Sequence, residues 1–223
     1  MTNRTLRDFV GETVWGDLLA LAFDRWHPAG SVLMHQGESG THVLAVRSGV
    51  AKVVRAERNG ELTLLAFRGP GELLGEVAVL GGGGRLASVE TLTRCCVAVM
   101  SRAEFLRFVA KHDLSPALMR YALARLSESD RARSGGAVLT RLAAILVRVA
   151  EISGQSGDSA DSSGQSLELA LTRQELAQYL RASRNTVTAQ LAGLEASGVH
   201  ARRGRIVITD LTALRRVSEG LAD

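Results

Sequence analysis

Cysteine is scarce in this 223-residue chain, which has only two such residues. Cys95 and Cys96 are adjacent, so they cannot supply the four ligands of a zinc site or an iron–sulfur cluster. They lie in an apolar run typical of a strand, where neighbouring side chains point to opposite faces. We therefore predict no metal site, and we interpret the cysteines as core or surface thiols, with a redox pair as the alternative.

Long apolar segments are also missing. The most apolar window, residues 137–150, is interrupted by Arg141 and Arg148, so no membrane span is predicted. The first ten residues are polar and of mixed charge, unlike a secretory signal. The sequence thus predicts a protein of the reducing cytoplasm with no membrane partner.

The residue patterns of a nucleotide-dependent enzyme are lacking as well. We find no phosphate-loop lysine, no nucleophile beside a base and no cluster of metal ligands. The histidines are scattered without ligand spacing, which argues against haem. We therefore predict that the chain is not an enzyme, an expectation that turnover of a bound nucleotide would contradict.

The residues that are present suffice for two domains, since 46% of them are hydrophobic. The net charge is only +4, but residues 183–216 hold six arginines against Glu195 and Asp210. Positive charge is therefore concentrated near the C-terminal end, as in a nucleic-acid-binding domain.

The N-terminal half changes character after residue 26. Residues 6–26 carry apolar side chains at helical spacing, whereas residues 27–100 form short alternating runs separated by glycine turns. This pattern predicts an antiparallel barrel or roll. The predicted strands cover residues 31–35, 43–47, 51–57, 61–68, 87–93 and 95–100.

A winged helix-turn-helix is predicted from Leu171 to Ile208. Thr172 and Glu175 form a capping box that begins a helix over residues 172–180, and the turn at residues 181–182 leads to Ser183, which caps a second helix to residue 196. Residues 198–209 follow as a hairpin that turns at Arg203-Gly204.

The polar face of the second helix has the side chains that read base edges. Arginine can pair with guanine, asparagine with adenine, and a threonine methyl can contact thymine. The helix start and the basic hairpin suit phosphate contacts. The alternative is a small helical bundle with a solvated arginine-rich face. The predicted DNA contacts are Thr172, Arg173, Ser183, Arg184, Asn185, Thr186, Thr188, Gln190, Arg203 and Arg205.

The second informative stretch, residues 74–89, reads LGEVAVLGGGGRLASV. Arg85 can provide the forked counter-charge that a cyclic phosphate needs. The spacing from Gly75-Glu76 to Arg85 and Ala87-Ser88 resembles the phosphate-binding cassette of cyclic-nucleotide-binding domains. With the helix-turn-helix, the chain from about Phe9 to Val217 resembles the cyclic AMP receptor protein and fumarate-nitrate regulator (Crp/Fnr) family of bacterial transcription factors.

The resemblance implies an α+β fold with an N-terminal cyclic-nucleotide-binding roll (residues 1–110), a dimerisation helix and hinge (111–136) and a C-terminal winged helix-turn-helix (137–223). It also implies cyclic AMP, or another cyclic nucleotide, as ligand, with Glu76 accepting from the ribose 2′-hydroxyl. Ser129 and Asp130 are implied as contacts to the base. The full set of implied ligand residues is Gly75, Glu76, Val77, Ala78, Arg85, Leu86, Ala87, Ser88, Ser129 and Asp130.

The chain departs from the family pattern at three positions. Leu86 replaces a common serine or threonine after the arginine, Asn185 replaces the usual glutamate of the recognition helix, and Ala189 replaces an arginine. The alternative for Arg85 and Glu76 is a surface pair on a barrel that binds nothing. Residues 81–84, four glycines, suggest a loop that is mobile when the site is empty.

Residues 114–133 predict a long helix with a narrow apolar seam. The family uses this helix for its dimer interface, and the alternative is packing against its own barrel. Ser134-Gly135-Gly136 is the predicted hinge, residues 137–152 a further helix, and residues 153–166 a flexible loop. The seam residues are Leu114, Leu118, Tyr121, Ala122 and Leu126.

Together these features predict a homodimeric transcription regulator that reads a two-fold symmetric DNA site and contacts RNA polymerase. A cyclic nucleotide in the roll would control it. The alternatives are a regulator of the same family with another effector or none, and a signalling scaffold whose terminal domain binds protein.

Overall fold

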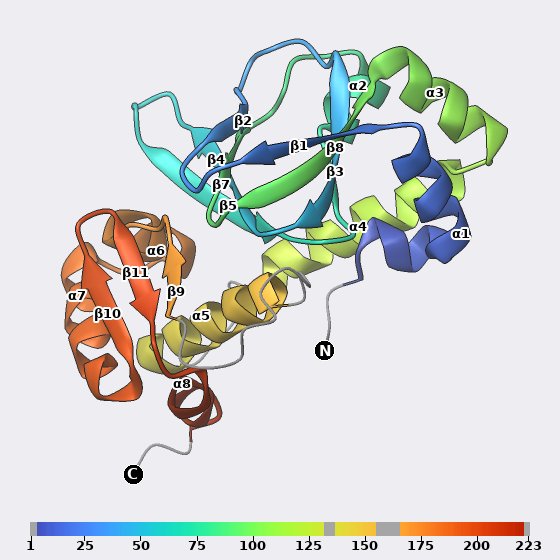
Figure 1. Cartoon of the computed structure of the whole chain (residues 1–223). Helices are drawn as coiled ribbons and strands as arrows, with labels where there is room; N and C mark the ends of the chain where they lie inside the picture. The colour runs from blue at the N-terminus through green and yellow to red at the C-terminus, as the bar shows by residue number, and fades with distance from the viewer. Residues whose placement is uncertain (1–3, 132–136, 155–165, 221–223) are drawn as a thin grey trace.

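The computed structural model describes residues 4–131, 137–154 and 166–220, with side chains omitted for residues 128–131. The predicted hinge at Ser134-Gly135-Gly136 and most of the predicted loop at residues 153–166 lie outside the described residues. Figure 1 shows a β-roll above a smaller helical domain, with the long helix α4 (Ser115–Arg131) running beneath the roll.

The roll consists of two four-stranded antiparallel sheets, which confirms the predicted antiparallel roll. One sheet has the strand order β1–β8–β3–β6 and the other β2–β7–β4–β5. Apolar side chains from both sheets, including Leu44, Leu74, Val89 and Val97, form the core between them. The strands are β1 (Phe23–His27), β2 (Val32–Met34), β3 (His42–Ser48), β4 (Ala51–Ala56), β5 (Leu62–Arg68), β6 (Leu73–Leu74), β7 (Ser88–Thr91) and β8 (Cys95–Ser101).

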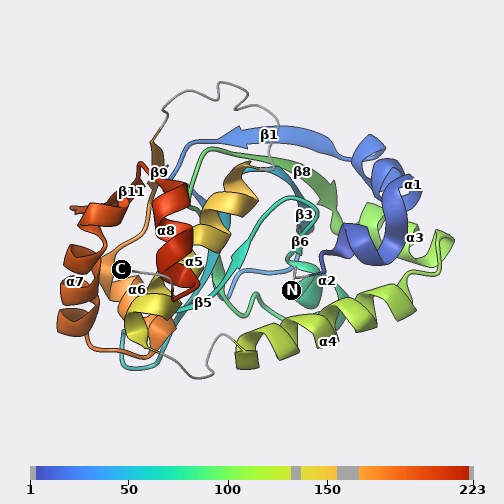
Figure 2. The same cartoon turned by 90° about the horizontal axis from the view of Figure 1, so that it is seen from below.

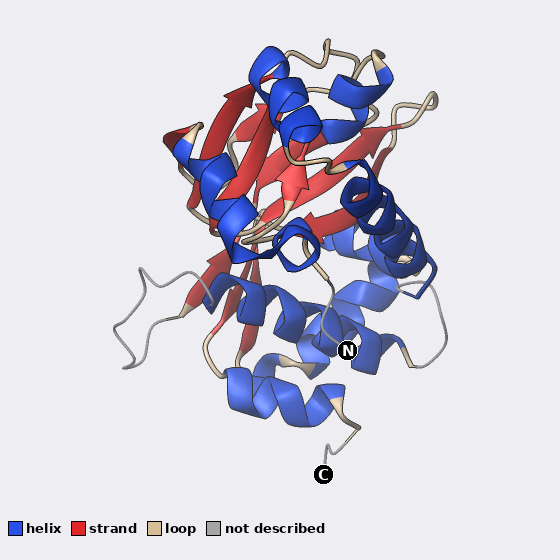
Figure 3. Ribbon diagram, turned by 90° about the vertical axis from the view of Figure 1, so that its right-hand side faces the viewer, coloured by secondary structure: helices blue, strands red, loops and turns tan. Residues whose placement is uncertain are grey.

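Three helices cover the β3–β8 side of the roll. They are α1 (Leu6–Ala20), α3 (Arg102–Lys111) and α4, and their buried side chains form one cluster with Val43 and Met100. Capping boxes begin α1 and α3, because in each case the residue before the helix exchanges hydrogen bonds with an acid three residues later. Figure 3 shows these helices from the side, packed against the strands.

The prediction of one helix over residues 6–26 is wrong beyond residue 20. The chain leaves the helix at Leu21, and Phe23–His27 forms β1, which pairs antiparallel with β8. The apolar residues at 23 and 26 fit helical spacing, but the backbone hydrogen bonds to β8 decide the conformation. This is a long-range pairing that local spacing does not reveal.

The predicted seam on α4 is also wrong in part. Leu114, Leu118 and Tyr121 are buried in the core of their own domain, so the alternative packing holds for them. Ala122 and Leu126 are exposed. The reason is that α1 and β6 cover the side of α4 that carries Leu118 and Tyr121.

The C-terminal domain is the predicted winged helix-turn-helix. The second helix ends at Gly193 rather than at residue 196, because a 3-10 turn over Glu195–Ser197 leads to Gly198, which has a φ of 76°. The elements are α5 (Val138–Gly154), β9 (Leu167–Leu169), α6 (Arg173–Leu180), α7 (Arg184–Gly193), β10 (Val199–Arg202), β11 (Arg205–Ile208) and α8 (Leu211–Ser218).

The two cysteines lie inside the roll. Both are buried, and Cys95 Sγ donates to the carbonyl of Val50. Burial raises the pKa of the Cys95 thiol to about 11, so this thiol is protonated and unreactive at neutral pH. The interpretation as core thiols is therefore favoured. Among the helices of the described ranges, none is both long and apolar enough to cross a bilayer.

Candidate functional site

A pocket of about 260 Å³ opens in the roll beside α4. The short helix α2 (Glu76–Gly81) and the chain around Arg85 form one wall, and Arg125 and Leu126 of α4 contribute to another. The structure brings seven of the predicted ligand residues together here, namely Gly75, Glu76, Val77, Ala78, Arg85, Leu86 and Ala87.

Arg85 is a buried cation in the wall of this pocket, with 4% of its surface exposed. Its Nη2 donates to the carbonyl of His42 at 2.8 Å and its Nη1 to the carbonyl of Gly75 at 3.3 Å. Its Nε is buried and finds no hydrogen-bond partner among the described residues. Burial lowers the pKa of Arg85, while Glu38 and Glu76 act in the opposite direction. A buried guanidinium with a donor to spare fits an anionic group.

Gly75 is required by the position of Arg85. A Cβ at this glycine would lie 2.2 Å from Arg85 Nη1, and its φ of 84° is one that other residues rarely adopt. A larger residue here would have a strained backbone and would push the Arg85 guanidinium and the Met34 side chain aside. This contact fixes one edge of the pocket.

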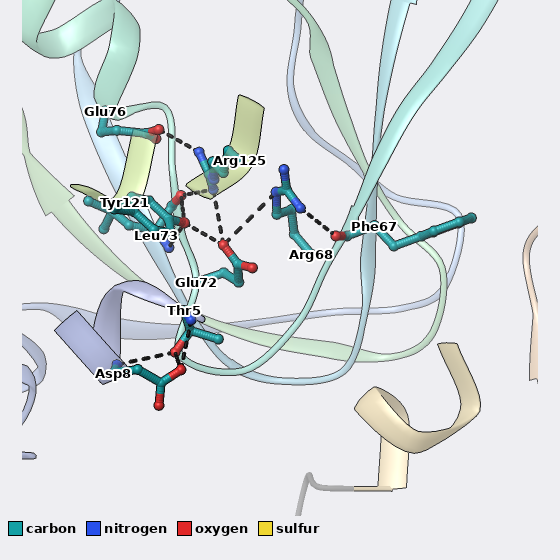
Figure 4. A network of polar contacts seen from close by, with 9 residues as sticks. All are labelled: Thr5, Asp8, Phe67, Arg68, Glu72, Leu73, Glu76, Tyr121 and Arg125. Atoms are coloured by element: carbon teal, nitrogen blue, oxygen red, sulfur yellow. Dashed lines mark hydrogen bonds and ion pairs between the residues drawn. The ribbon is translucent and has the colours of Figure 1, made fainter. Parts of the chain in front are cut away.

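Glu76 does not point freely into the pocket, because Arg125 of α4 holds it. Arg125 Nη1 lies 2.5 Å from Glu76 Oε1, and Arg125 Nη2 lies 3.2 Å from Glu72 Oε2. Tyr121 donates to the same Glu72 carboxylate. Figure 4 shows this buried network between α4 and the chain just before α2. The predicted ribose acceptor is thus ion-paired to the long helix.

The charges of this network set its protonation. Burial raises the pKa of the Tyr121 phenol well above its usual value, so it remains a donor. Burial acts against the charge of Arg125, but the Glu76 and Glu72 carboxylates outweigh it and raise the pKa of Arg125. Arg125 was not predicted from the sequence. The available signal was its position four residues after Tyr121, on the same face of the helix.

Three predicted ligand residues are not placed in the pocket. Ser88 is not among the residues that line it, because its hydroxyl accepts from the backbone N–H of Gln36 at 2.9 Å. In strand β7 the side chains alternate, so Val89 faces the pocket and Ser88 does not. The side chains of Ser129 and Asp130 lie outside the described residues.

The second site is the polar face of α7. Its cap is formed as predicted, with Ser183 Oγ accepting from the N–H of Thr186 at 3.0 Å, while Val187 and Leu191 are buried against α5 and α6. Arg184, Asn185 and Thr188 are exposed, and Thr186 and Gln190 are half-buried. The side chains that can reach base edges therefore share one open surface.

The remaining predicted DNA contacts lie around this surface. Thr172 and Arg173 are half-buried in the first turn of α6, where Arg173 Nη2 donates to the carbonyl of Ala201 at 3.1 Å. Arg203 is exposed at the tip of the wing, and Arg205 forms an exposed ion pair of 2.7 Å with Glu168 of β9. An exposed pair of this kind contributes little to stability, so a phosphate can compete for Arg205.

Two family models match the chain one after the other. The model of the cyclic nucleotide-binding domain matches residues 24–112, and that of the Crp-like helix-turn-helix domain matches residues 140–217. The chain belongs to the Crp/Fnr family. It is a DNA-binding transcription regulator with a cyclic-nucleotide-binding domain, and not an enzyme.

Relatives of this Crp/Fnr regulator match along most of their length. The CRP-like cAMP-activated global transcriptional regulator of Mycobacterium tuberculosis is 29% identical over 202 residues, which cover 87% of this chain and 84% of the relative. The cAMP-activated global transcriptional regulator CRP of Haemophilus influenzae is 28% identical over 188 residues, 82% of each chain.

Solved structures support the fold. A CRP-family transcriptional regulator from Thermus thermophilus superposes with a TM-score of 0.63 at 22% identity, covering 87% of this chain and 96% of the other. The c-di-GMP responsive global regulator CLP of Xanthomonas campestris superposes with a TM-score of 0.57 at 23% identity, covering 88% and 98%.

Proposed function

We propose that this regulator is controlled by a cyclic mononucleotide, with cyclic AMP as the first candidate. The observation that carries the proposal is the buried Arg85, whose Nε has no partner among the described residues and which lines a pocket with Glu76. Arg85 would hold the cyclic phosphate, and Glu76, now paired with Arg125, would accept from the ribose hydroxyl. The two relatives described above are both named as cAMP-activated.

The size of the pocket favours a mononucleotide over a cyclic dinucleotide. Its volume of about 260 Å³ lies just below the range of small-molecule sites, which runs from roughly 300 to 1,000 Å³. The second candidate function is a regulator of the same family with another effector or with none, and two observations favour it. Leu86 stands where the family commonly has a hydroxyl, and one structural neighbour is named as c-di-GMP responsive.

The experiment that tests the ligand is calorimetric titration of the full chain with cyclic AMP, cyclic GMP and c-di-GMP. We expect saturable binding of cyclic AMP at one site per chain, with weaker or no binding of the other two. Absence of heat and an unchanged melting temperature with all three would overturn the proposal and leave a regulator without nucleotide control. Binding of c-di-GMP alone would favour the second candidate.

We propose further that the regulator is a homodimer paired through α4. Met119, Leu123 and Leu126 are 67%, 56% and 65% exposed, and their spacing of four and three residues is that of a coiled-coil seam. Figure 2, seen from below, shows α4 along one border of the molecule, away from α7. A second copy of α4 would cover this stripe and make a two-fold axis.

A homodimer of this kind would read a two-fold symmetric site with the two α7 helices in successive major grooves about 34 Å apart. Ligand can shift the dimer between a conformation that does not bind DNA and one that does only if the two conformations bind the ligand with different affinity. A hundredfold difference in ligand affinity supplies about 2.7 kcal/mol. By reciprocity, DNA raises ligand affinity by the same factor. Such a regulator contacts RNA polymerase at promoters. Because that polymerase works in the cytoplasm, we expect the regulator there as well.

Replacing Asn185 with alanine is expected to weaken DNA binding at one base position. Asn185 is exposed in the first turn of α7, where a bidentate amide contact to adenine contributes about 1–3 kcal/mol of discrimination. The measurement is competition binding against duplexes substituted one base pair at a time. An equal loss on every duplex would instead make Asn185 a contact to the DNA backbone.

A further inference from the structure

A buried lysine of the roll forms an ion pair with the DNA-binding domain. Lys52 of β4 is 6% exposed, and its Nζ contacts Glu175 of α6. The same Nζ lies 3.2 Å from Glu90 Oε2 of β7 and 3.3 Å from the carbonyl of Ala170. A lysine is rarely buried unless it is paired, so this cation holds together two carboxylates from different domains.

Other close contacts surround the ion pair. The rings of Phe67 in β5 and Tyr179 in α6 are 5.2 Å apart, and the N–H of Ala170 donates to the carbonyl of Leu92 at 2.9 Å. A Cβ on Gly69 would lie 1.9 Å from Cγ2 of Ile152 in α5, so the Ile152 side chain packs directly against the backbone at Gly69. Figures 1 and 2 both show α6 beside β5.

The two carboxylate oxygens of Glu175 bind different partners. One oxygen, Oε2, accepts from the N–H and the hydroxyl of Thr172, each at 2.8 Å, and so caps α6. The other, Oε1, is bound by Lys52. The first turn of α6, which contains the predicted phosphate contacts Thr172 and Arg173, is therefore tied to the roll. Both residues are half-buried, and Arg173 donates to the carbonyl of Ala201 in its own domain.

We propose that the Lys52–Glu175 pair is an autoinhibitory latch, which holds the first turn of α6 against the roll in the ligand-free regulator. While the pair holds, this turn cannot leave the roll to meet a DNA backbone. The proposal rests on the proposed DNA-binding face. Removal of Lys52 leaves the Glu175 carboxylate without its counter-charge, and removal of the Glu175 charge takes away the ionic partner of Lys52 in the other domain, so either change loosens the docking. The latch then opposes DNA binding until the domain separates from the roll.

The test compares Lys52→Met with Lys111→Met in the full ligand-free chain. Lys111 is the other lysine, it is exposed on α3, and its loss changes net charge equally. Hydrogen exchange over residues 166–180 reports docking, and affinity for a duplex selected from a randomised pool reports release. We expect Lys52→Met to speed exchange and to tighten ligand-free binding by roughly tenfold, within the range of measured couplings. Lys111→Met should change neither.

A second variant tests the same pair from the other side and does not depend on the folding of the first. Glu175→Gln keeps an acceptor for the capping box, which tolerates glutamine, but removes the charge that binds Lys52. It should reproduce both effects. Faster exchange with unchanged or weaker ligand-free DNA binding would overturn the latch, as would unchanged exchange in both variants.

The outcomes separate the latch from the proposed DNA-binding face. If the wild-type chain selects a duplex but neither variant binds it more tightly without ligand, only the latch fails. If neither the wild type nor the variants select any duplex, both proposals fail. If only the variants do, the latch is supported.

Discussion

Replacing Arg85 with alanine is expected to abolish cyclic AMP binding and leave a folded chain. The guanidinium is 4% exposed and keeps its Nε without a partner among the described residues. Each hydrogen bond to a charged group contributes about 1.5–3 kcal/mol, and an arginine fork makes two with a phosphate. Losing both reduces affinity by more than about a hundredfold. Titration calorimetry measures this loss, and circular dichroism confirms the fold.

Two variants make the Arg85 result specific. Arg58→Ala removes an arginine that is exposed in the turn between β4 and β5, and it should bind cyclic AMP like the wild type. Arg85→Lys keeps the charge but not the fork, so its affinity should fall between the other two. If Arg85→Ala binds cyclic AMP with unchanged affinity, Arg85 does not belong to the site, and the buried guanidinium serves the fold alone.

Short-range chemistry explains why much of the fold could be predicted from the sequence. The capping box of Thr172 and Glu175, the cap at Ser183 and the turn at Arg203-Gly204 each involve residues within four positions of one another. Alternation between glycine turns likewise located six strands of the roll. These features are decided locally, and the structure confirms them.

Long-range pairing explains what could not be predicted. Phe23–His27 becomes a strand because β8 offers its edge, and Tyr121 turns toward its own domain because α1 and β6 cover that side of α4. The ligand site shows the same division. Glycine and arginine spacing located Gly75 and Arg85, but only the packing of α4 against the roll brings Arg125 onto Glu76.

The docking of the two domains also depends on packing rather than on motif. Lys52 and Glu175 are 123 positions apart, and the Glu175 carboxylate was identified from the sequence only as a helix cap. Because the helix cap already accounts for a glutamate at this position, the sequence gives no sign that Glu175 also binds a distant lysine. The exposed apolar stripe on α4 could not be predicted either, because only the folded chain shows which apolar residues of this helix remain exposed to solvent.

Replacing Leu123 with glutamate is therefore expected to convert a dimer into monomers. Leu123 is 56% exposed in the single chain, so its substitution should change the free energy of unfolding by less than about 0.5 kcal/mol. In a paired helix the same position is central to the Met119–Leu123–Leu126 stripe, where two facing glutamates repel one another. Sedimentation velocity should show the mass of one chain, with an unchanged circular dichroism spectrum.

The loss of the dimer should weaken binding to a symmetric DNA site by roughly 10²–10⁴-fold, because two linked half-site contacts become independent. The matched control is Leu21→Glu, a leucine that is 57% exposed at the end of α1 and lies outside the stripe; it should remain dimeric and bind DNA normally. A Leu123→Glu protein that still sediments as a dimer would place the interface elsewhere. Monomers that keep full affinity for the symmetric site would show that α7 reads each half-site alone, and the two-fold model of recognition would then be abandoned.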